Sequence, residues 1–348
     1  MPFESDITTP RTGATFGVGS LPHRSMTAAL DFAWNSSAIP TIPSLPRRSP
    51  AEGMIAQALS GIEGVSFGQY GGISIDAASL VVSPNITSNI DADAFGAFAA
   101  FLETFEQRNT GITHVKWQFV GPITLSIELM KIGLEPREAI DLALRAVRTH
   151  VSSLETHVRN ACGNITQIIV LDEPSLAQAL EYGFVISTEE AIDLVSGALM
   201  SIPSRHISGL HSCAKTNWGA MLATGANVLS IPVPSSSDAM AMGEMLVCAP
   251  RISEHLERGG RIAWGAVRTD GPISVNADRS WKALMESMCE LVKAGVDPLL
   301  VRRMSYLTPA CGLGTLSDAV ASRVMMHVAD VAAKVAEQAT ASRLTLGS

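Results

Sequence analysis

The sequence has few aromatic residues, no long apolar run and no block of basic residues, and each absence excludes a class of protein. Aromatic residues make up only 5% of the chain although hydrophobic residues reach 47%, so a large core must be mainly aliphatic. No apolar run approaches the roughly 20 residues that span a bilayer. The net charge of −8, without a basic cluster, counts against nucleic acid. We therefore expect neither a membrane nor a nucleic acid as a partner.

The N-terminus also lacks the charged-then-apolar layout of a signal peptide, so the sequence predicts a cytoplasmic protein. Its five cysteines are odd in number and scattered, which does not indicate a disulfide framework in a reducing compartment. Cys289 falls within a helical pattern and is expected to be a buried core thiol, and Cys162 and Cys248 are expected to be structural. Cys213 and Cys311 differ because they follow strand-like runs.

Short β-rich runs alternate with longer segments of helical periodicity, which predicts a parallel sheet. About eight such units fit this length, so we expect an α/β fold, a (β/α)8 TIM barrel. The whole chain, residues 1–348, is expected to be this single domain, with elaborated loops around residues 35–90. A capping box from Ser187 to Glu190 marks one helix start. Strands are expected at 14–18, 113–120, 167–172, 206–211, 227–231, 261–265 and 303–308.

Side chains that bind metals follow two of these strands. The carboxyl ends of parallel barrel strands open on one face, where the chemistry of such enzymes takes place. His211 and Cys213 are two residues apart on an extended segment, so their side chains point the same way, and Cys311 follows the last strand. Imidazole and thiolates suit Zn²⁺. The sequence therefore predicts a zinc site, and thiolate-rich zinc favours activation of a substrate thiol over hydrolysis.

Several motifs occur in order between about residue 12 and residue 330, and together they resemble a known family. That family is the C-terminal catalytic barrel of cobalamin-independent methionine synthase, grouped with uroporphyrinogen decarboxylases and with zinc-dependent corrinoid or coenzyme M methyltransferases. The N-terminal barrel of the long enzyme has no counterpart, so the chain looks like a short, core-only form. The motifs are VGSLPH, KWQFVGPITL, VLDEPSL, HSC followed by a tryptophan, and PACGL.

The resemblance implies roles for residues at several strand ends. It assigns the zinc to the histidine and two cysteines already identified, and the carboxylate of homocysteine to Gly19 and Ser20. Backbone N–H groups and a hydroxyl suit such an anion. Asp172 would hold the ammonium group, with Glu173 beside it, and His23 would lie at the mouth. The plainer interpretations are a turn at Gly19 and Ser20, a salt bridge at Asp172 and Glu173, and local hydrogen bonds at His23.

The chain also departs from the family pattern. Pro232 stands where the family has a glutamate as fourth zinc ligand, which leaves water, the substrate thiol or another carboxylate for that position. Asp270 lies near the position of the family's proton-donating histidine. Glu128 and Gln178 replace a tryptophan and a glutamate that bind folate. A flat pterin needs an aromatic face and paired hydrogen bonds, so we expect a methylated corrinoid (methylcobalamin or a corrinoid protein) as donor in place of methyltetrahydrofolate.

These observations predict a zinc-dependent methyltransferase that converts homocysteine to methionine. One alternative is methyl or alkyl transfer to another thiol such as coenzyme M, which would leave Asp172 without an ammonium partner. Decarboxylation of a porphyrinogen would need no metal and would make the cysteines incidental. A non-catalytic module that binds zinc or a corrinoid protein is a further alternative, favoured by the missing glutamate.

Overall fold

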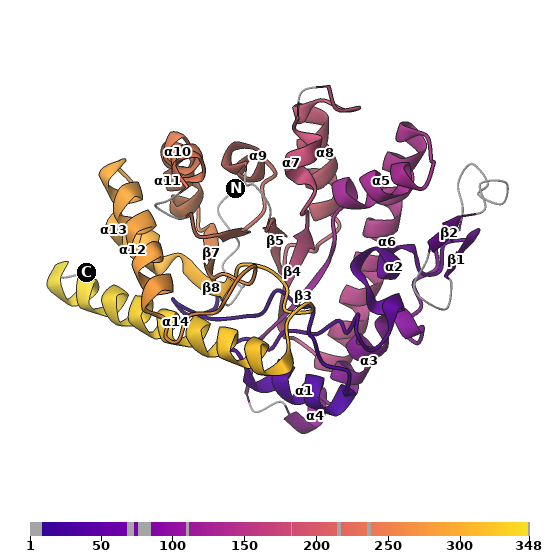
Figure 1. Ribbon diagram of the computed structural model, residues 1–348, viewed down its shortest axis with the longest axis horizontal. Coiled ribbons are helices and arrows are strands. Elements are labelled where there is room, and N and C mark those ends of the chain that lie inside the picture. The colour runs from indigo at the N-terminus through magenta and orange to yellow at the C-terminus, as the bar shows by residue number, and fades with distance from the viewer. Residues whose placement is uncertain are drawn as a thin grey trace.

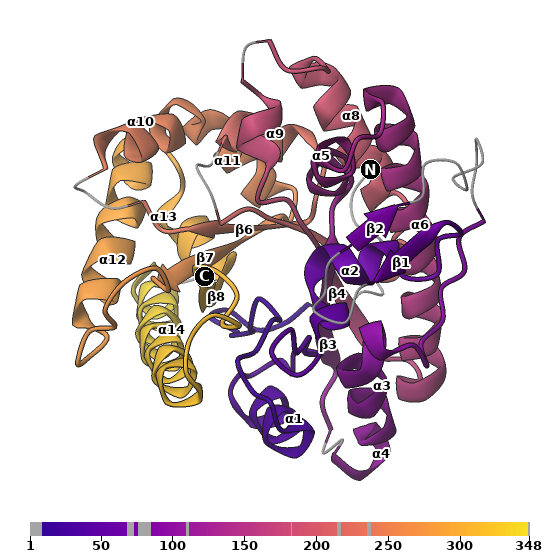
Figure 2. The same ribbon diagram turned by 45° about the vertical axis from the view of Figure 1, so that its right-hand side comes forward.

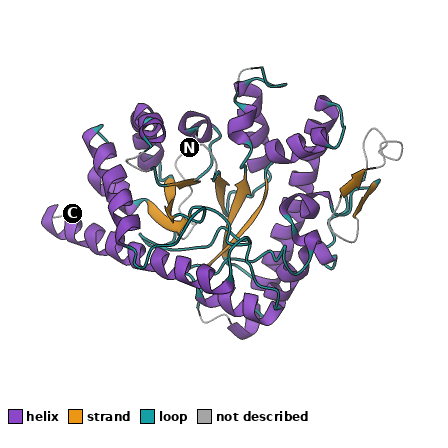
Figure 3. Cartoon of the chain, viewed as in Figure 1, coloured by secondary structure: helices purple, strands orange, loops and turns teal. Residues whose placement is uncertain are grey.

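The centre of the molecule is a six-stranded parallel sheet whose strands are neighbours in chain order (Figures 1 and 3). The computed structural model describes residues 9–67, 73–75, 85–108, 111–181, 183–213, 217–234 and 238–346. The strands of the sheet are β3 (His114–Val120), β4 (Thr166–Asp172), β5 (Ile207–His211), β6 (Val228–Pro232), β7 (Arg261–Val267) and β8 (Ser305–Pro309).

Strand β4 shows why these segments form a parallel sheet. It reads TQIIVLD and is buried at every position, as expected for a strand with both faces covered. Ile168 and Val170 belong to a small apolar cluster on one face, whereas Ile169 and Leu171 belong to the large cluster on the other. The large cluster includes the buried sides of the helices, so the small one is the interior of the curved sheet.

Helices surround this sheet, as the turned view shows (Figure 2). None of the described helices is long and apolar enough to cross a membrane. A short antiparallel hairpin, β1 (Val65–Phe67) with β2 (Ile73–Ile75), lies outside the main sheet. The helices are α1 (Met26–Asn35), η1 (Pro50–Glu52), α2 (Met54–Leu59), η2 (Asp93–Phe95), α3 (Gly96–Glu103), α4 (Phe105–Arg108), α5 (Pro122–Lys131), α6 (Pro136–Cys162), α7 (Leu176–Ala179), α8 (Thr188–Leu199), α9 (Trp218–Ala223), α10 (Ala239–Val247), α11 (Ala249–Glu257), α12 (Asp278–Lys293), α13 (Pro298–Arg303) and α14 (Asp318–Leu346).

Two N-terminal segments that are not regular strands lie between β8 and β3. The first makes a parallel bridge to β8 at Thr15, and the second makes one to β3 at Thr41. A further parallel bridge, between Ser20 and Ser44, joins the two segments. Backbone pairing therefore continues from β8 to β3 through single bridges. The hydrogen bonds involved include Phe16 N to Leu307 O (3.2 Å), Ile39 N to Thr15 O (2.9 Å) and Ile42 N to Lys116 O (2.8 Å).

The fold agrees with the sequence in part. The six predicted strands from residue 113 onward are confirmed within a few residues, and the capping box at Ser187 and Glu190 is present. The predicted strand at 14–18 is only a bridged segment, so a complete eight-stranded barrel stays a prediction. Part of the predicted loop region 35–90 forms α2, which packs against β3 and α6. Residues 68–72 and 76–84 of that region lie outside the described residues.

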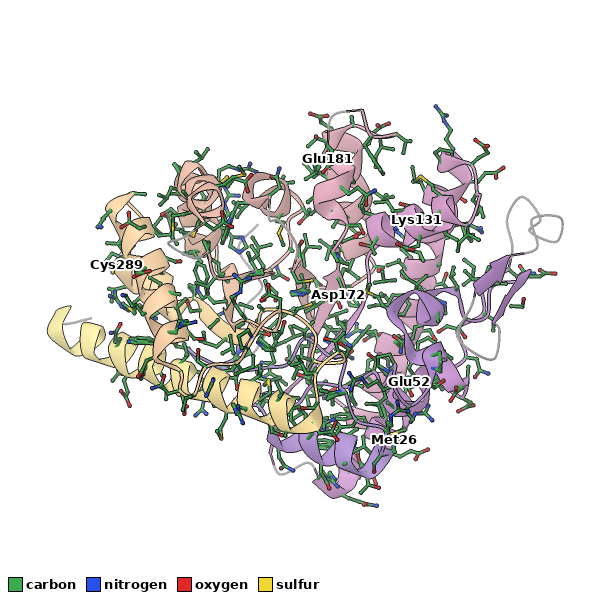
Figure 4. All side chains as sticks on the ribbon, in the orientation of Figure 1. Met26, Glu52, Lys131, Asp172, Glu181 and Cys289 are labelled. Atoms are coloured by element: carbon green, nitrogen blue, oxygen red, sulfur yellow. The ribbon has the colours of Figure 1, made fainter. Side chains whose placement is uncertain are left out.

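The prediction that Cys289 is a buried core thiol is wrong. Its side chain is exposed on α12, and Figure 4 shows it on the outer side of the molecule. The buried positions of α12 include Leu284, Met288 and Leu291. Cys289 follows Met288 by one residue, a rotation of about 100° around the helix, and therefore leaves the buried face.

Candidate metal centre

The structure brings His211, Cys213 and Cys311 together at the carboxyl ends of the strands. His211 is the last residue of β5, Cys213 follows two residues later, and Cys311 follows β8. Their ligand atoms all lie within 4.8 Å of one another, and this is the one group of three or more potential ligands found among the described residues. Side chains from the fifth and last strands thus converge, as a curved sheet allows.

The imidazole of His211 is held in one orientation. Its Nδ1 shares a 2.9 Å hydrogen bond with the hydroxyl of Ser230, which is its partner on β6. Its Nε2 is buried and has no hydrogen-bond partner in the described part of the chain. A histidine that ligates a metal uses its other ring nitrogen in this way, which fixes the tautomer and the ring orientation. The orphaned Nε2 and the two nearby thiols therefore fit a zinc ion.

The two thiols interact with each other. The pKa of Cys311 is lowered because the Cys213 thiol donates a hydrogen bond to its sulfur and because His211 lies beside it. The pKa of Cys213 is raised, since it supplies that hydrogen bond and is itself partly buried. One thiolate therefore forms readily at this site, and a thiolate is the form of cysteine that binds metals.

Asp172 is the neighbour of His211 in the sheet. It ends β4, pairs in register with His211, and lies near the middle of the molecule in Figure 4. The side chain is buried, with 9% exposed, and its Oδ1 has no hydrogen-bond partner among the described residues. Burial raises the pKa of this carboxyl, whereas the charges of His211 and Lys116 lower it. A buried carboxylate oxygen without a partner is rare and is suited to a cationic ligand.

Both carboxyl oxygens of Glu173, the next residue, accept hydrogen bonds from other residues of the protein. Its Oε1 accepts from Ile123 N, and its Oε2 accepts from both the backbone N and the hydroxyl of Thr124, all at 2.7 Å. These donors begin α5, so the carboxyl caps that helix. A Cβ at Gly121 would lie 2.2 Å from Glu173 Oε1, which explains the glycine of the GP motif. Burial raises the pKa of Glu173 to about 7, against the hydrogen bonds from Thr124 and Ile123, which lower it.

The Gly19–Ser20 turn lies against the loop that carries Cys311. Gly19 has a φ of +145°, and a Cβ there would lie 1.9 Å from the side chain of Gln118. The hydroxyl of Ser20 lies close to Gly312, and Leu313 N donates to Ser20 O (2.9 Å). No hydrogen bond from the backbone N–H of Gly19 or Ser20 to another described residue is present. The turn thus has two backbone donors without a partner among the described residues, beside the loop that carries Cys311.

His23 and Asp270 are less closely connected to this group. His23 is buried with its ring 5.1 Å from that of Phe32, and its Nδ1 has no partner among the described residues. Asp270 is exposed and forms an ion pair with Arg268 (2.5 Å), whose guanidinium holds the pKa of the carboxyl below its usual range. The structure thus gives Asp270 no contact with the three potential ligands.

Sequence reasoning missed one contributor to the candidate site and undervalued two others. Ser230 was not identified because a serine within a strand is unremarkable until its histidine partner is known. For Lys116 and Gln118, which alternate with aromatic residues on one strand, the sequence indicates only a polar pair in an internal hydrogen-bond network. Lys116 is 1% exposed, and its Nζ donates to the Val18 carbonyl and to Gln118 Oε1 (3.0 Å). The alternation of polar and aromatic residues along KWQF was the available signal.

Comparisons with known proteins add a likeness of fold. No protein-family model matches the chain, and no curated protein matches its sequence. The structure is similar to a crystal structure of a Listeria monocytogenes protein described as a "putative vitamin-B12 independent methionine synthase". The two chains are 15% identical, the match covers 81% of this chain and 77% of the other, and the TM-score is 0.50. At this identity the likeness concerns the fold alone.

Proposed function

We propose that the chain is a zinc-dependent methyltransferase that transfers a methyl group to the thiol of homocysteine and forms methionine. The observation that carries this proposal is the convergence of His211, Cys213 and Cys311, with Nδ1 of the histidine bound by Ser230 and Nε2 free. The bridged segments at residues 14–20 and 39–44 would then be the first two strands of a (β/α)8 barrel. The mouth of such a barrel is where its catalytic residues lie.

The three residues would hold a zinc ion through one imidazole nitrogen and two sulfurs. When bound there, zinc would coordinate a substrate thiol and lower its pKa, so that the sulfur is a thiolate at neutral pH. Pro232 has no side-chain ligand to offer at the end of β6, which leaves a coordination position for that sulfur.

The protein's own residues would orient the amino-acid part of the substrate. The free N–H groups of Gly19 and Ser20 are suited to the carboxylate, and Asp172 Oδ1 is suited to the ammonium group. The orphaned carboxylate oxygen favours homocysteine over coenzyme M, which has no ammonium group to offer it. Glu173 would act indirectly by holding the start of α5, and His23 would line the mouth.

In the transfer step the substrate sulfur forms a bond to the methyl carbon while the bond between that carbon and its carrier breaks. The electron pair of that bond would stay on the carrier, and the thiol proton would pass to Asp270 or to water before the attack. We propose a methylated corrinoid as the carrier, because Glu128 is held by Lys131 (2.7 Å) and provides no aromatic face for a pterin. Asp270 is the proposed proton acceptor or donor at the rim.

X-ray absorption at the zinc edge tests the proposal directly. The purified full chain should contain about one zinc per chain, and homocysteine should add one sulfur neighbour to the spectrum, whereas 2-mercaptoethanesulfonate should add one only at higher concentration. Methylcobalamin should then yield methionine. A purified protein without zinc contradicts the proposal, and so does a zinc-edge spectrum that does not change when homocysteine is added. Methionine from methyltetrahydrofolate but not from methylcobalamin contradicts only the donor.

A further inference from the structure

Lys116 is a buried cation that the proposed function does not use. It lies on β3, and its whole side chain is inside the curved sheet with 1% exposed. Enclosing an ammonium group in this way costs several kcal/mol unless other groups compensate. Its two hydrogen-bond acceptors, the Val18 carbonyl and Gln118 Oε1, are both neutral, and it interacts with the charge of Asp172 without a hydrogen bond to that residue. A residue retained at such a cost needs a function that a buried apolar side chain could not supply.

The contact with Val18 fixes one peptide plane. All peptide bonds in the described residues are trans, and in a trans peptide the C=O and the following N–H point in opposite directions. Because the Val18 carbonyl points toward Lys116 Nζ, the Gly19 N–H points away from it. That N–H makes no hydrogen bond to a described residue. The lysine therefore determines which way a free backbone donor faces.

The same ammonium also holds the turn from a second side. It donates to Gln118 Oε1, and the Gln118 side chain fills the space where a Cβ at position 19 would lie. One residue further on, the Ser20 hydroxyl lies close to Gly312 in the loop after Cys311. Lys116 and Gln118 thus connect β3 to the turn, and the turn connects to the metal-binding loop.

We propose that Lys116 is a positioning residue for the substrate carboxylate. By donating from Nζ to the Val18 carbonyl, it holds the Val18–Gly19 peptide with the Gly19 N–H toward the bound carboxylate. This inference rests on the proposed function, because it assumes that Gly19 and Ser20 take the carboxylate of homocysteine. Lys116 itself touches neither the substrate nor the three potential metal ligands.

Lys116 also affects binding of the substrate ammonium group at Asp172. There its effect is unfavourable, whereas its effect on carboxylate binding is favourable. Burial lowers the pKa of Lys116 to about 8 although the charge of Asp172 raises it, and a pKa above neutrality leaves the group mostly charged at neutral pH. A positive charge near Asp172 repels a substrate ammonium group bound there. Loss of the Lys116 charge should therefore lower the affinity for a ligand that has only a carboxylate. The affinity for a ligand that has only an ammonium group should stay the same or rise.

Binding of three thiols to the zinc-loaded full chain tests this. Homocysteine has both groups, 4-mercaptobutanoate has only the carboxylate, and 3-aminopropane-1-thiol has only the ammonium group. In Lys116→Met, calorimetry should show that the affinities for homocysteine and 4-mercaptobutanoate fall about tenfold or more. A decrease of this size corresponds to the loss of one hydrogen bond to a charged group. The affinity for 3-aminopropane-1-thiol should stay the same or rise. Lys116→Gln, which keeps an N–H donor, should recover part of the carboxylate affinity.

Controls separate positioning from a general loss of structure. Lys131→Met removes an exposed lysine of α5 and should change none of the three affinities. Zinc content and the circular dichroism spectrum should be the same in all variants. Equal weakening of all three thiols in Lys116→Met, or no weakening of 4-mercaptobutanoate, overturns the inference alone. If the unmodified chain binds no homocysteine, the proposed function fails, and the inference fails with it.

Discussion

The two ends of strands β4 and β5 treat buried polar groups in opposite ways. At the amino ends of β4 and β5, a set of residues that we call the foot network (Glu155, Gln167, Arg205 and His206) satisfies its own hydrogen bonds. Glu155 Oε1 accepts from Arg205 Nη2 (2.5 Å) and from His206 Nε2 (2.9 Å). His206 Nδ1 accepts from Gln167 N (3.2 Å), so one neutral tautomer serves both partners.

The carboxyl ends of the same strands carry buried polar atoms with no partner among the described residues. Asp172 Oδ1, His211 Nε2 and Ser212 Oγ are all of this kind. Burial of such groups lowers stability unless something compensates, so their accumulation at one end needs an explanation. The foot network has its hydrogen bonds without any ligand, whereas the carboxyl ends of β4 and β5 leave these three atoms without a partner among the described residues. This difference along β4 and β5 supports the proposed site independently of any motif, although Tyr306 Oη on β8 is also buried without a partner in the described part of the chain.

The largest expected effect is the loss of zinc from the mouth. Cys311→Ser removes one of three ligands and should lower zinc affinity by at least about a hundredfold, more than loss of a supporting residue does. Metal analysis of the purified protein and competition with a chelator measure this.

Cys289→Ser is the matched control, because it removes an exposed thiol from α12. It should retain about one zinc per chain. If both serine variants lose zinc to the same degree, the metal is not bound by the convergent group, and the comparison between the two ends loses its main support.

The second effect should appear at the foot. Glu155→Leu leaves His206 and Arg205 without their acceptor and should lower the free energy of unfolding by about 3 kcal/mol, the low end for a broken buried pair because Arg205 is half exposed. Glu155→Gln keeps a hydrogen-bond acceptor, so its free energy of unfolding should fall less. Urea unfolding measures the change, and zinc content should not move. Loss of zinc from Glu155→Leu while it remains folded would contradict the separation of the two ends.

The six regular strands of the sheet could be predicted from the sequence, whereas the irregular pairing of the two N-terminal segments could not. Strands β3 to β8 are short runs rich in residues typical of buried strands and are followed by turn residues, a pattern that can be recognised locally. The segment at 14–18 has a similar composition, but Gly17 N donates to the Thr41 hydroxyl and not to a neighbouring backbone. That contact depends on tertiary structure, so no local pattern could reveal it.

The candidate site was predictable in its three potential metal ligands and less so in its supporting residues. His211, Cys213 and Cys311 have side chains with few ordinary structural uses at strand ends, so the pattern alone predicted their convergence. Asp172 and Glu173 were indistinguishable in sequence because they are adjacent acidic residues. Their roles diverge because side chains of successive residues point to opposite faces of a strand end.

The third expected effect tests the different roles of the adjacent residues Asp172 and Glu173. Glu173→Gln replaces an acceptor with an amide that cannot accept from all three donors, so the free energy of unfolding should fall by about 1–2 kcal/mol. Asp172→Asn removes a carboxyl that lacks a hydrogen bond on one oxygen but interacts with Lys116, so stability should fall less than in Glu173→Gln, whereas homocysteine affinity should fall at least tenfold. Urea unfolding and calorimetry give both numbers. Equal destabilisation by the two variants would show that Asp172 is structural.

The smallest effect concerns acid and the foot network. Burial raises the pKa of Glu155, but hydrogen bonds from Arg205 and His206 outweigh it and hold the pKa below the ordinary value of 4.5. A lowered folded-state pKa means that its stabilisation is complete above pH 4.5 and is lost as the pH falls through the folded-state value. The stability difference between the unmodified chain and Glu155→Gln should therefore be constant near neutrality and shrink in acid. The change is small because a protonated Glu155 still accepts hydrogen bonds. A difference that grows as the pH falls would mean that Glu155 is not held as a carboxylate.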